Sequence, residues 1–184
     1  PTLGPFVISG TDYAPIRGTH NNFRTACAPT LPTPSDACGA LGEFGSMAPP
    51  GTMLTGAGRF SDITDGTSNT FVIGEVAGRH QVYTKGRKAV MPNTPGSAGW
   101  TLNAAYFDHN NKITVRGFNT TGTVQDGGCC AINCNNVEQI FSFHPGGVII
   151  LRTDGSASFV SETIAAGVLG ALISRAGGEV VPAN

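Results

Sequence analysis

The stretch FSFHPGGVIILRTDGSASFV, from Phe141 to Val160, decides the fold. Val148 to Leu151 is apolar and rich in β-branched residues, and Ser156 to Val160 alternates small or polar with apolar residues. Asp154 and Gly155 lie between these two runs and form a two-residue hairpin signal, because both residues tolerate a positive φ. The stretch therefore predicts two antiparallel strands joined by a type I′ turn.

The same stretch contains one histidine and one aspartate, and the pair resembles a catalytic dyad. Extended residues rise about 3.3 Å each, so the spacing places His144 and Asp154 roughly 20–30 Å apart, whereas proton transfer needs about 3 Å. We therefore expect both residues to be architectural. Asp154 serves the turn, and His144 donates to a carbonyl of the Pro145-Gly146-Gly147 turn. The alternative is a metal site that His144 shares with His80 or His109.

The residues after the hairpin predict a C-terminal helix. Ser161 is the expected cap, Arg175 lies in the last turn, and Gly177-Gly178 ends the helix. Apolar residues recur at helical spacing and form one stripe, which comprises Ile164, Val168, Leu169, Leu172 and Ile173. This stripe is expected to pack on the sheet.

The residues before the hairpin predict a second core strand and many loops. Thr70 to Val76 contains consecutive apolar residues and is typical of a buried strand. Ser61 is expected to cap a single helical turn over residues 62–64, which Gly66 ends. Shorter strands are expected around Gln81 to Thr84 and Lys112 to Arg116, and residues 1–59 are expected to form loops with short strands.

Composition supports one β-rich domain over residues 1–184. The chain has 26 Gly and 12 Pro, which favours many turns over long helices. Charged residues make up only 12% of the chain and the net charge is −1. We do not expect the protein to bind nucleic acid, because the sequence has no stripe of Lys and Arg interleaved with aromatic residues that could neutralise phosphates and stack on bases. The predicted fold class is α+β, with an antiparallel sheet, long loops and a helix packed on the sheet.

Five cysteines form two clusters in irregular sequence: Cys27 and Cys38, then Cys129, Cys130 and Cys134. Cys27 and Cys38 bracket a proline-rich loop that would gain stability from a covalent clasp. Clustered cysteines in poorly charged loops favour disulfides formed in an oxidising compartment. Zinc is the rival interpretation, but the CC-x3-C spacing does not fit the usual two-residue spacing of zinc ligands.

The sequence contains two further candidate sites, one for metal binding and one for modification. Asp62, Asp65 and Asn69 offer three oxygen ligands within eight residues, and calcium accepts such ligands. The alternative is that Asp65 and Asn69 bond to their own backbone in consecutive turns. Asn119 begins an Asn-Thr-Thr acceptor pattern for glycosylation and marks an exposed loop.

Three stretches together resemble a known family. They are DITDGTSNTFVIGE (62–75), SFHPGGVIILRTDGS (142–156) and ALISRAGGEVV (171–181). They are similar to bacterial pilin-like proteins with the His-nine-Asp-Gly signature associated with prepilin processing, in which His144, Asp154 and Gly155 match the signature. Members resemble type IV pilins and pseudopilins, with a leader, a hydrophobic N-terminal helix and a β-rich head. The resemblance covers the head only and carries no catalytic residues. The turn Asp65-Gly66-Thr67-Ser68-Asn69 belongs to the first stretch.

The resemblance implies a structural protein at the cell surface or outside the cell, which associates with itself or with other pilin-like subunits. Membrane anchoring is implied only through an N-terminal helix that these residues do not include, and no cofactor is implied. The first alternative is a module that binds calcium or a glycan, the latter through exposed Tyr13, Tyr83, Trp100 and Tyr106. The second alternative is an enzyme in which Cys129 or Cys130 acts as a nucleophile with His144.

Overall fold

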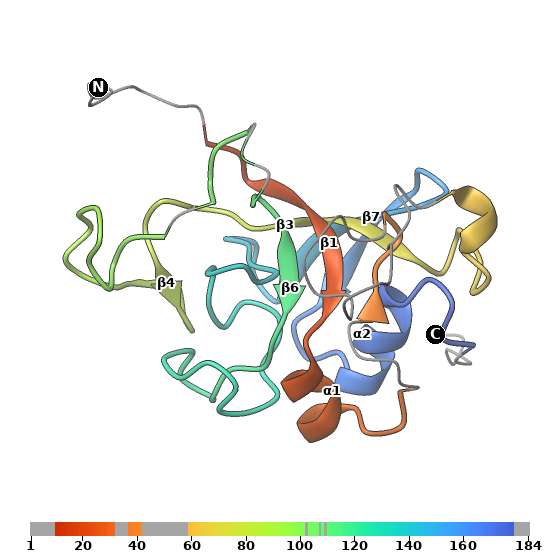
Figure 1. Cartoon of the computed structure of the whole chain (residues 1–184). Helices are drawn as coiled ribbons and strands as arrows, with labels where there is room; N and C mark the ends of the chain where they lie inside the picture. Colours follow the sequence, from red (N-terminus) through yellow and green to blue (C-terminus); the bar gives the residue numbers. More distant parts are fainter. Residues whose placement is uncertain are drawn as a thin grey trace, which may run out of the picture.

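A computed structural model describes residues 10–31, 37–41, 59–101, 103–106, 108 and 110–178 of the chain. Its centre is a six-stranded sheet (Figure 1). The strands run in the order β2-β1-β3-β7-β8, and β6 pairs with β1. Their bounds are β1 Tyr13–Thr19, β2 Ala37–Cys38, β3 Phe71–Glu75, β6 Ile113–Val115, β7 Gly147–Arg152 and β8 Ala157–Ser161. A separate two-stranded ribbon joins β4 Tyr83–Thr84 to β5 Lys88–Ala89.

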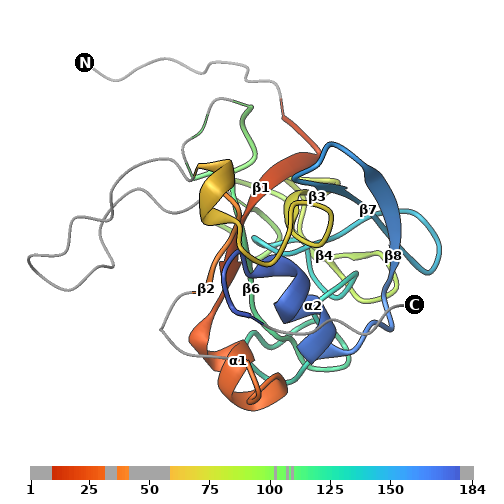
Figure 2. The ribbon, with the colours of Figure 1, turned by 90° about the vertical axis from the view of Figure 1, so that its right-hand side faces the viewer.

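The described part also contains short helices that lie beside the sheet. They are α1 Asn21–Cys27, the 3-10 helix η1 Phe60–Asp62 and α2 Ala166–Ile173. Figure 2 shows α1 and α2 on the same side of the sheet, and α2 contacts β1, β3 and α1. The structure thus confirms an α+β fold with a C-terminal helix. No helix within the described ranges is long and apolar enough to span a membrane.

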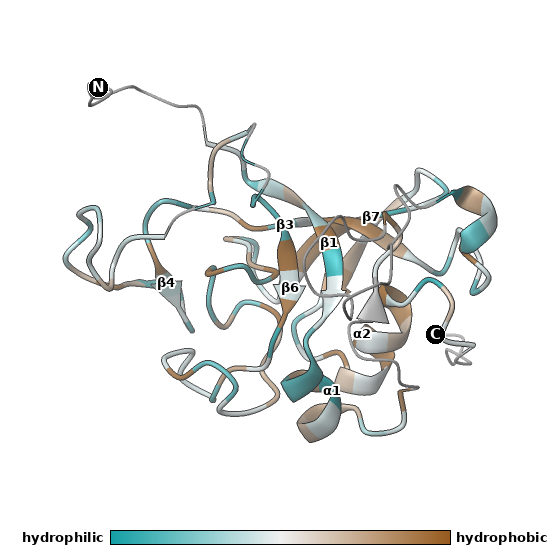
Figure 3. Cartoon of the chain, in the orientation of Figure 1, coloured by the Kyte–Doolittle hydropathy of each residue, from teal (hydrophilic) through white to brown (hydrophobic). Residues whose placement is uncertain are grey.

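The face of the sheet toward α2 carries the core. Side chains from β1, β3, β6, β7 and β8 meet Phe23 of α1 and Leu169, Leu172 and Ile173 of α2 in one buried cluster. The hydropathy colouring of Figure 3 shows apolar residues gathered on the central strands and on the side of α2. Burial of this apolar area is the main source of folding free energy. The predicted apolar stripe of the helix is therefore confirmed, with Ile164 and Val168 packed at its margin.

The sheet is mixed rather than wholly antiparallel, which corrects the prediction. β1 pairs antiparallel with β2 and β3, but parallel with β6. Almost one hundred residues of chain separate β1 from β6, so no short turn forces them to run in opposite directions. Turn signals predict the direction of adjacent strands only.

β1 occupies the middle of the sheet, although its sequence does not predict a central strand. Pro15 and Gly18 interrupt the run YAPIRGT, and both residues are unfavourable inside strands. The N-terminal half pairs with β3 through Tyr13, Ala14 and Pro15. The C-terminal half pairs with β2 and β6, with a register shift between Ile16 and Gly18. β1 therefore changes its partner strands, from β3 to β2 and β6, in the part of the strand that contains Pro15 and Gly18.

The predicted hairpin is confirmed, but its turn differs. The register Leu151↔Ala157 extends through an Arg152 N–H bond to the Ser156 carbonyl, which leaves a three-residue loop over 153–155. Only Gly155 has a positive φ, at 88°. A type I′ turn with Asp154 at positive φ is therefore wrong. The loop matches the pattern of a turn followed by one left-handed glycine.

Two expected helix caps are also wrong. Ser161 is the last residue of β8, and α2 begins only at Ala166 after the uncapped N-cap Ala165. The Ser161 hydroxyl instead accepts a hydrogen bond from the Thr163 N–H. Ser61 lies inside η1, where Asp62 accepts from the Arg59 N–H at 2.8 Å. Serine marks both turns correctly, but as a turn residue rather than as a helix cap.

Candidate functional site

The first and second motifs meet at one end of β7. The Thr67 carbonyl accepts hydrogen bonds from the Asp154 N–H at 3.1 Å and from the Thr153 hydroxyl at 2.7 Å. The Ser68 carbonyl accepts from the Arg152 guanidinium at 2.9 Å. The turn before β3 is thereby joined to the hairpin tip, so the two sequence motifs form one contact.

The third motif is held to the first by Asp65 of the first motif. The two carboxylate oxygens of Asp65 accept the backbone N–H groups of Gly177 and Gly178, in the third motif, at 2.7 and 2.9 Å. Gly66 follows with φ at 96°, and Asn69 donates its amide to the Asp65 carbonyl at 3.3 Å. Asn69 therefore bonds locally as the turn interpretation expected, whereas the Asp65 carboxylate reaches across to the segment after α2.

Asp154 itself completes the hairpin tip. Its carboxylate accepts from both the N–H and the hydroxyl of Ser156, at 2.8 and 2.7 Å. These two hydrogen bonds favour the charged form and lower the pKa of Asp154 below its usual value. The carboxylate serves the turn geometry, and it is exposed.

The two carboxylates of the candidate calcium site accept hydrogen bonds from different backbone N–H groups and do not share a ligand. Asp62 accepts from the Arg59 N–H, whereas both oxygens of Asp65 are engaged by Gly177 and Gly178. In the described ranges no group of three or more His, Cys, Asp or Glu side chains is placed to hold a metal ion. A calcium ion would have to displace the two glycine amides from Asp65.

Removal of divalent cations is therefore expected to leave thermal stability unchanged. Because backbone amides already occupy the Asp65 oxygens, we expect this turn to hold no calcium for EDTA to extract. Differential scanning fluorimetry with excess EDTA, and with added calcium, checks the prediction. A rise in Tm with calcium that disappears in the Asp65→Asn variant would contradict it.

His144 and Asp154 lie at opposite ends of β7, since one precedes the strand and the other follows it. Six extended residues span about 20 Å, so the strand separates the two side chains. His144 pairs instead with Glu75, whose carboxylate lies 3.3 Å from the histidine Nε2. The other Glu75 oxygen accepts the Ile149 N–H at 2.6 Å.

Glu75 is a buried acidic residue of this site that the sequence did not single out. Its side chain is only 7% exposed, whereas that of His144 is 58% exposed. The position of Glu75 directly after the apolar run of β3 could have indicated this role, because a carboxylate buried at the end of a core strand requires hydrogen-bond or ionic partners. Tyr13 lies across from Glu75 on the neighbouring strand, and burial together with the Glu75 charge raises the pKa of the Tyr13 hydroxyl. The cluster unites β1, β3 and the turn before β7.

One disulfide joins the two cysteine clusters, and the other lies within the second cluster. Cys27 bonds to Cys129, over a sequence separation of 102, and Cys130 bonds to Cys134. The Cys27–Cys38 clasp that the proline-rich loop favoured does not form, because Cys27 has another partner. Proximity in sequence suggested the clasp, but α1 and the 128–130 loop are brought together by the fold, and the Cys27 sulfur also lies 3.5 Å from the Gly128 carbonyl. The side chain of Cys38 lies outside the described residues.

The disulfides also occupy the two cysteines that the enzyme alternative requires as a nucleophile. Cys129 and Cys130 are both disulfide-bonded in the structure, so neither presents a thiolate to His144. His80 stacks on Trp100 with ring centroids 4.9 Å apart, which is a packing role for both residues. His109 lies outside the described residues.

Asn119 organises its own turn. Its side-chain oxygen accepts the N–H groups of Thr123 and Val124 at 2.8 and 3.1 Å, and its amide donates to the Thr123 hydroxyl at 3.1 Å. The candidate glycosylation site thus lies in a tight loop, partly buried. The side chain that would carry a sugar contributes hydrogen bonds to the turn.

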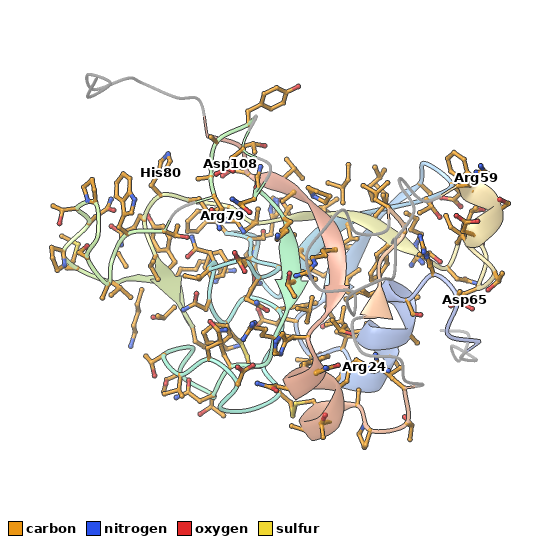
Figure 4. The ribbon with its side chains drawn as sticks, in the orientation of Figure 1. Arg24, Arg59, Asp65, Arg79, His80 and Asp108 are labelled. Carbon is orange, nitrogen blue, oxygen red and sulfur yellow. A yellow bond between two sulfur atoms is a disulfide. The ribbon has the colours of Figure 1, made fainter. Side chains whose placement is uncertain are left out.

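Arg79 is a second buried ionic residue that the sequence did not single out. Its guanidinium donates to the Asn103 carbonyl at 2.7 Å and to the Asn111 side chain at 2.9 Å. It also donates to the carbonyls of Asn136 and Lys112. Desolvation lowers the pKa of Arg79 to about 10, partly opposed by Glu138 and Asp108. Figure 4 shows Arg79 near Asp108, and its hydrogen bonds anchor Asn103, Asn111 and Lys112.

The chain matches one known protein family over most of its length. A family model described as "Protein of unknown function (DUF1559)" matches residues 9–167. The chain belongs to the DUF1559 family. The match includes β1, β3, the hairpin and the first two motifs, while the segment after residue 167 lies beyond it. No curated protein and no solved structure matches this DUF1559 chain.

Proposed function

We propose that this chain is a non-enzymatic extracellular head of pilin or pseudopilin type, which assembles with copies of itself or with related subunits at the cell surface. One observation carries the proposal: the polar side chains of the motifs hold segments of the head together. Asp65 binds the segment after α2, Asp154 closes the hairpin, and His144 pairs with Glu75. Such residues maintain a shape rather than perform a reaction.

The disulfides support the extracellular part of the proposal. Bridges of this kind form and persist in oxidising compartments, and they suit a turn-rich head with long loops. Membership of the DUF1559 family and the resemblance of the three motifs to pilin-like proteins support the assembly part. No cofactor is needed for either role.

The test uses native, unproteolysed material examined by negative-stain electron microscopy and by intact-mass analysis of the same sample. Regular filaments or tubes built from a chain heavier than these 184 residues are the expected result. Dispersed particles with the mass of this chain alone would overturn assembly. Peptide mapping without reduction is expected to recover the Cys27–Cys129 linkage, and free thiols at both positions would contradict the extracellular location.

A further inference from the structure

An open groove of about 480 Å³ lies beside the first half of β1, where Tyr13, Ala14, Pro15 and Ile73 of β3 line it. Ala14 and Ile16 point into the core, so Tyr13 and Pro15, which alternate with them along β1, face the other side. Pro15 pairs with Ile73 of β3, and these residues form the floor of the groove.

The wall of the groove comes from the segment that Arg79 anchors. Tyr106, Asp108 and Asn111 line this side. The segment is held beside the start of β1 by a bridge between Gly10 and Ala105, and by the Thr11 N–H bond to the Ala104 carbonyl at 3.1 Å. Floor and wall are therefore joined through backbone hydrogen bonds.

Two exposed tyrosines flank this groove. Tyr13 is 52% exposed and Tyr106 is 77% exposed. The third tyrosine, Tyr83, packs against Phe141 and Phe143. Tyr13 lies directly across from Glu75 in the pairing of β1 with β3, and burial together with the nearby Glu75 charge raises its pKa, so its hydroxyl stays protonated at neutral pH. Exposed rings at the edge of a hollow are a signature of binding surfaces.

The polar groups of the groove are held in fixed positions. Asp108 accepts the Asn110 N–H at 2.9 Å, and the side-chain oxygen of Asn111 accepts from Arg79 at 2.9 Å. The Thr11 hydroxyl also lines the groove and bonds to the backbone of Tyr13. None of the lining residues is a lysine or an arginine. A few convergent polar groups beside an apolar floor are typical of small-molecule sites.

We propose that this groove binds a neutral carbohydrate chain, which stacks its C–H faces on Tyr13 and Tyr106 and exchanges hydrogen bonds with Asp108 and Asn111. An anionic ligand is disfavoured, because the groove is lined by the carboxylate of Asp108 and by no lysine or arginine side chain. A cation held by aromatic rings usually requires a closed cage, whereas this groove is open and its Tyr106 ring is mostly exposed. The binding role goes beyond the structural function, since the groove needs no assembly to bind.

The test measures binding of three neutral hexasaccharides, cellohexaose, chitohexaose and maltohexaose, to the whole 184-residue chain by isothermal titration calorimetry. At least one is expected to bind, and Tyr106→Ala is expected to weaken its binding about tenfold through loss of a stacking surface. Phe159→Ala is the matched control, because Phe159 is an exposed aromatic residue on β8 outside the groove. It is expected to leave the affinity unchanged, and an unchanged Tm shows that both variants fold.

Three results would overturn the proposal. The first is no binding of any of the hexasaccharides at millimolar concentration. The second is binding that Tyr106→Ala leaves intact, and the third is equal weakening by Phe159→Ala. Hexalysine is titrated in parallel, and binding of this cation alone with a dependence on Tyr106 would also refute a carbohydrate ligand. Because filament formation is read separately by microscopy, filaments without carbohydrate binding would refute only this inference.

Discussion

Replacement of Gly122 by alanine is expected to abolish cooperative folding or to destabilise the protein by more than about 4 kcal/mol. A Cβ at this position would lie 1.8 Å from the Cys134 carbonyl oxygen and 2.9 Å from the Lys85 nitrogen. Both atoms belong to the backbone, so no side-chain rotation relieves the overlap. The left-handed φ of 74° adds a penalty of about 1–2 kcal/mol for any residue with a Cβ.

Gly86→Ala is the matched control for this prediction. Its φ is 75°, almost the same as that of Gly122, but a Cβ there meets nothing within 4 Å. The control therefore carries the backbone penalty alone, about 1–2 kcal/mol. Urea unfolding followed by circular dichroism compares the two variants. Equal losses would show that the close approach of residues 122 and 134 is not what requires glycine.

The second large effect concerns the bridge between Cys27 and Cys129. Removal of both cysteines as Cys27→Ala with Cys129→Ala is expected to destabilise the protein by about 4–5 kcal/mol, because the bridge closes a loop of about one hundred residues. The double variant Cys130→Ala with Cys134→Ala opens a loop of only a few residues and is expected to cost about 2 kcal/mol. Unfolding in urea without reductant measures both.

Reductant supplies the control for the disulfide prediction. When both proteins are unfolded in excess dithiothreitol, which also opens the Cys130–Cys134 bridge, the wild-type protein and the variant that lacks Cys27 and Cys129 are expected to give the same unfolding curve. If both double variants were equally destabilised, loss of local packing rather than loop closure would be the cause.

Features that depend on neighbouring residues were predictable. The β7–β8 hairpin follows from two apolar runs around a turn signal, and β3 follows from its consecutive apolar residues. The apolar stripe of α2 was also predicted, although the helix begins later, because Ser161 to Ala165 first ends a strand. At the candidate site, the same logic gave the separation of His144 and Asp154.

The sequence by itself determined the α+β class, the hairpin, the strand before it and the apolar face of the final helix, because local periodicity and turn residues encode these features. The tertiary structure alone decided the parallel pairing of β6 with β1 and the bridge between Cys27 and Cys129. It also decided the contact of Glu75 with His144 and the groove between Tyr13 and Tyr106. These contacts join residues many positions apart, and their partners are selected by burial of one shared core rather than by any pattern along the chain.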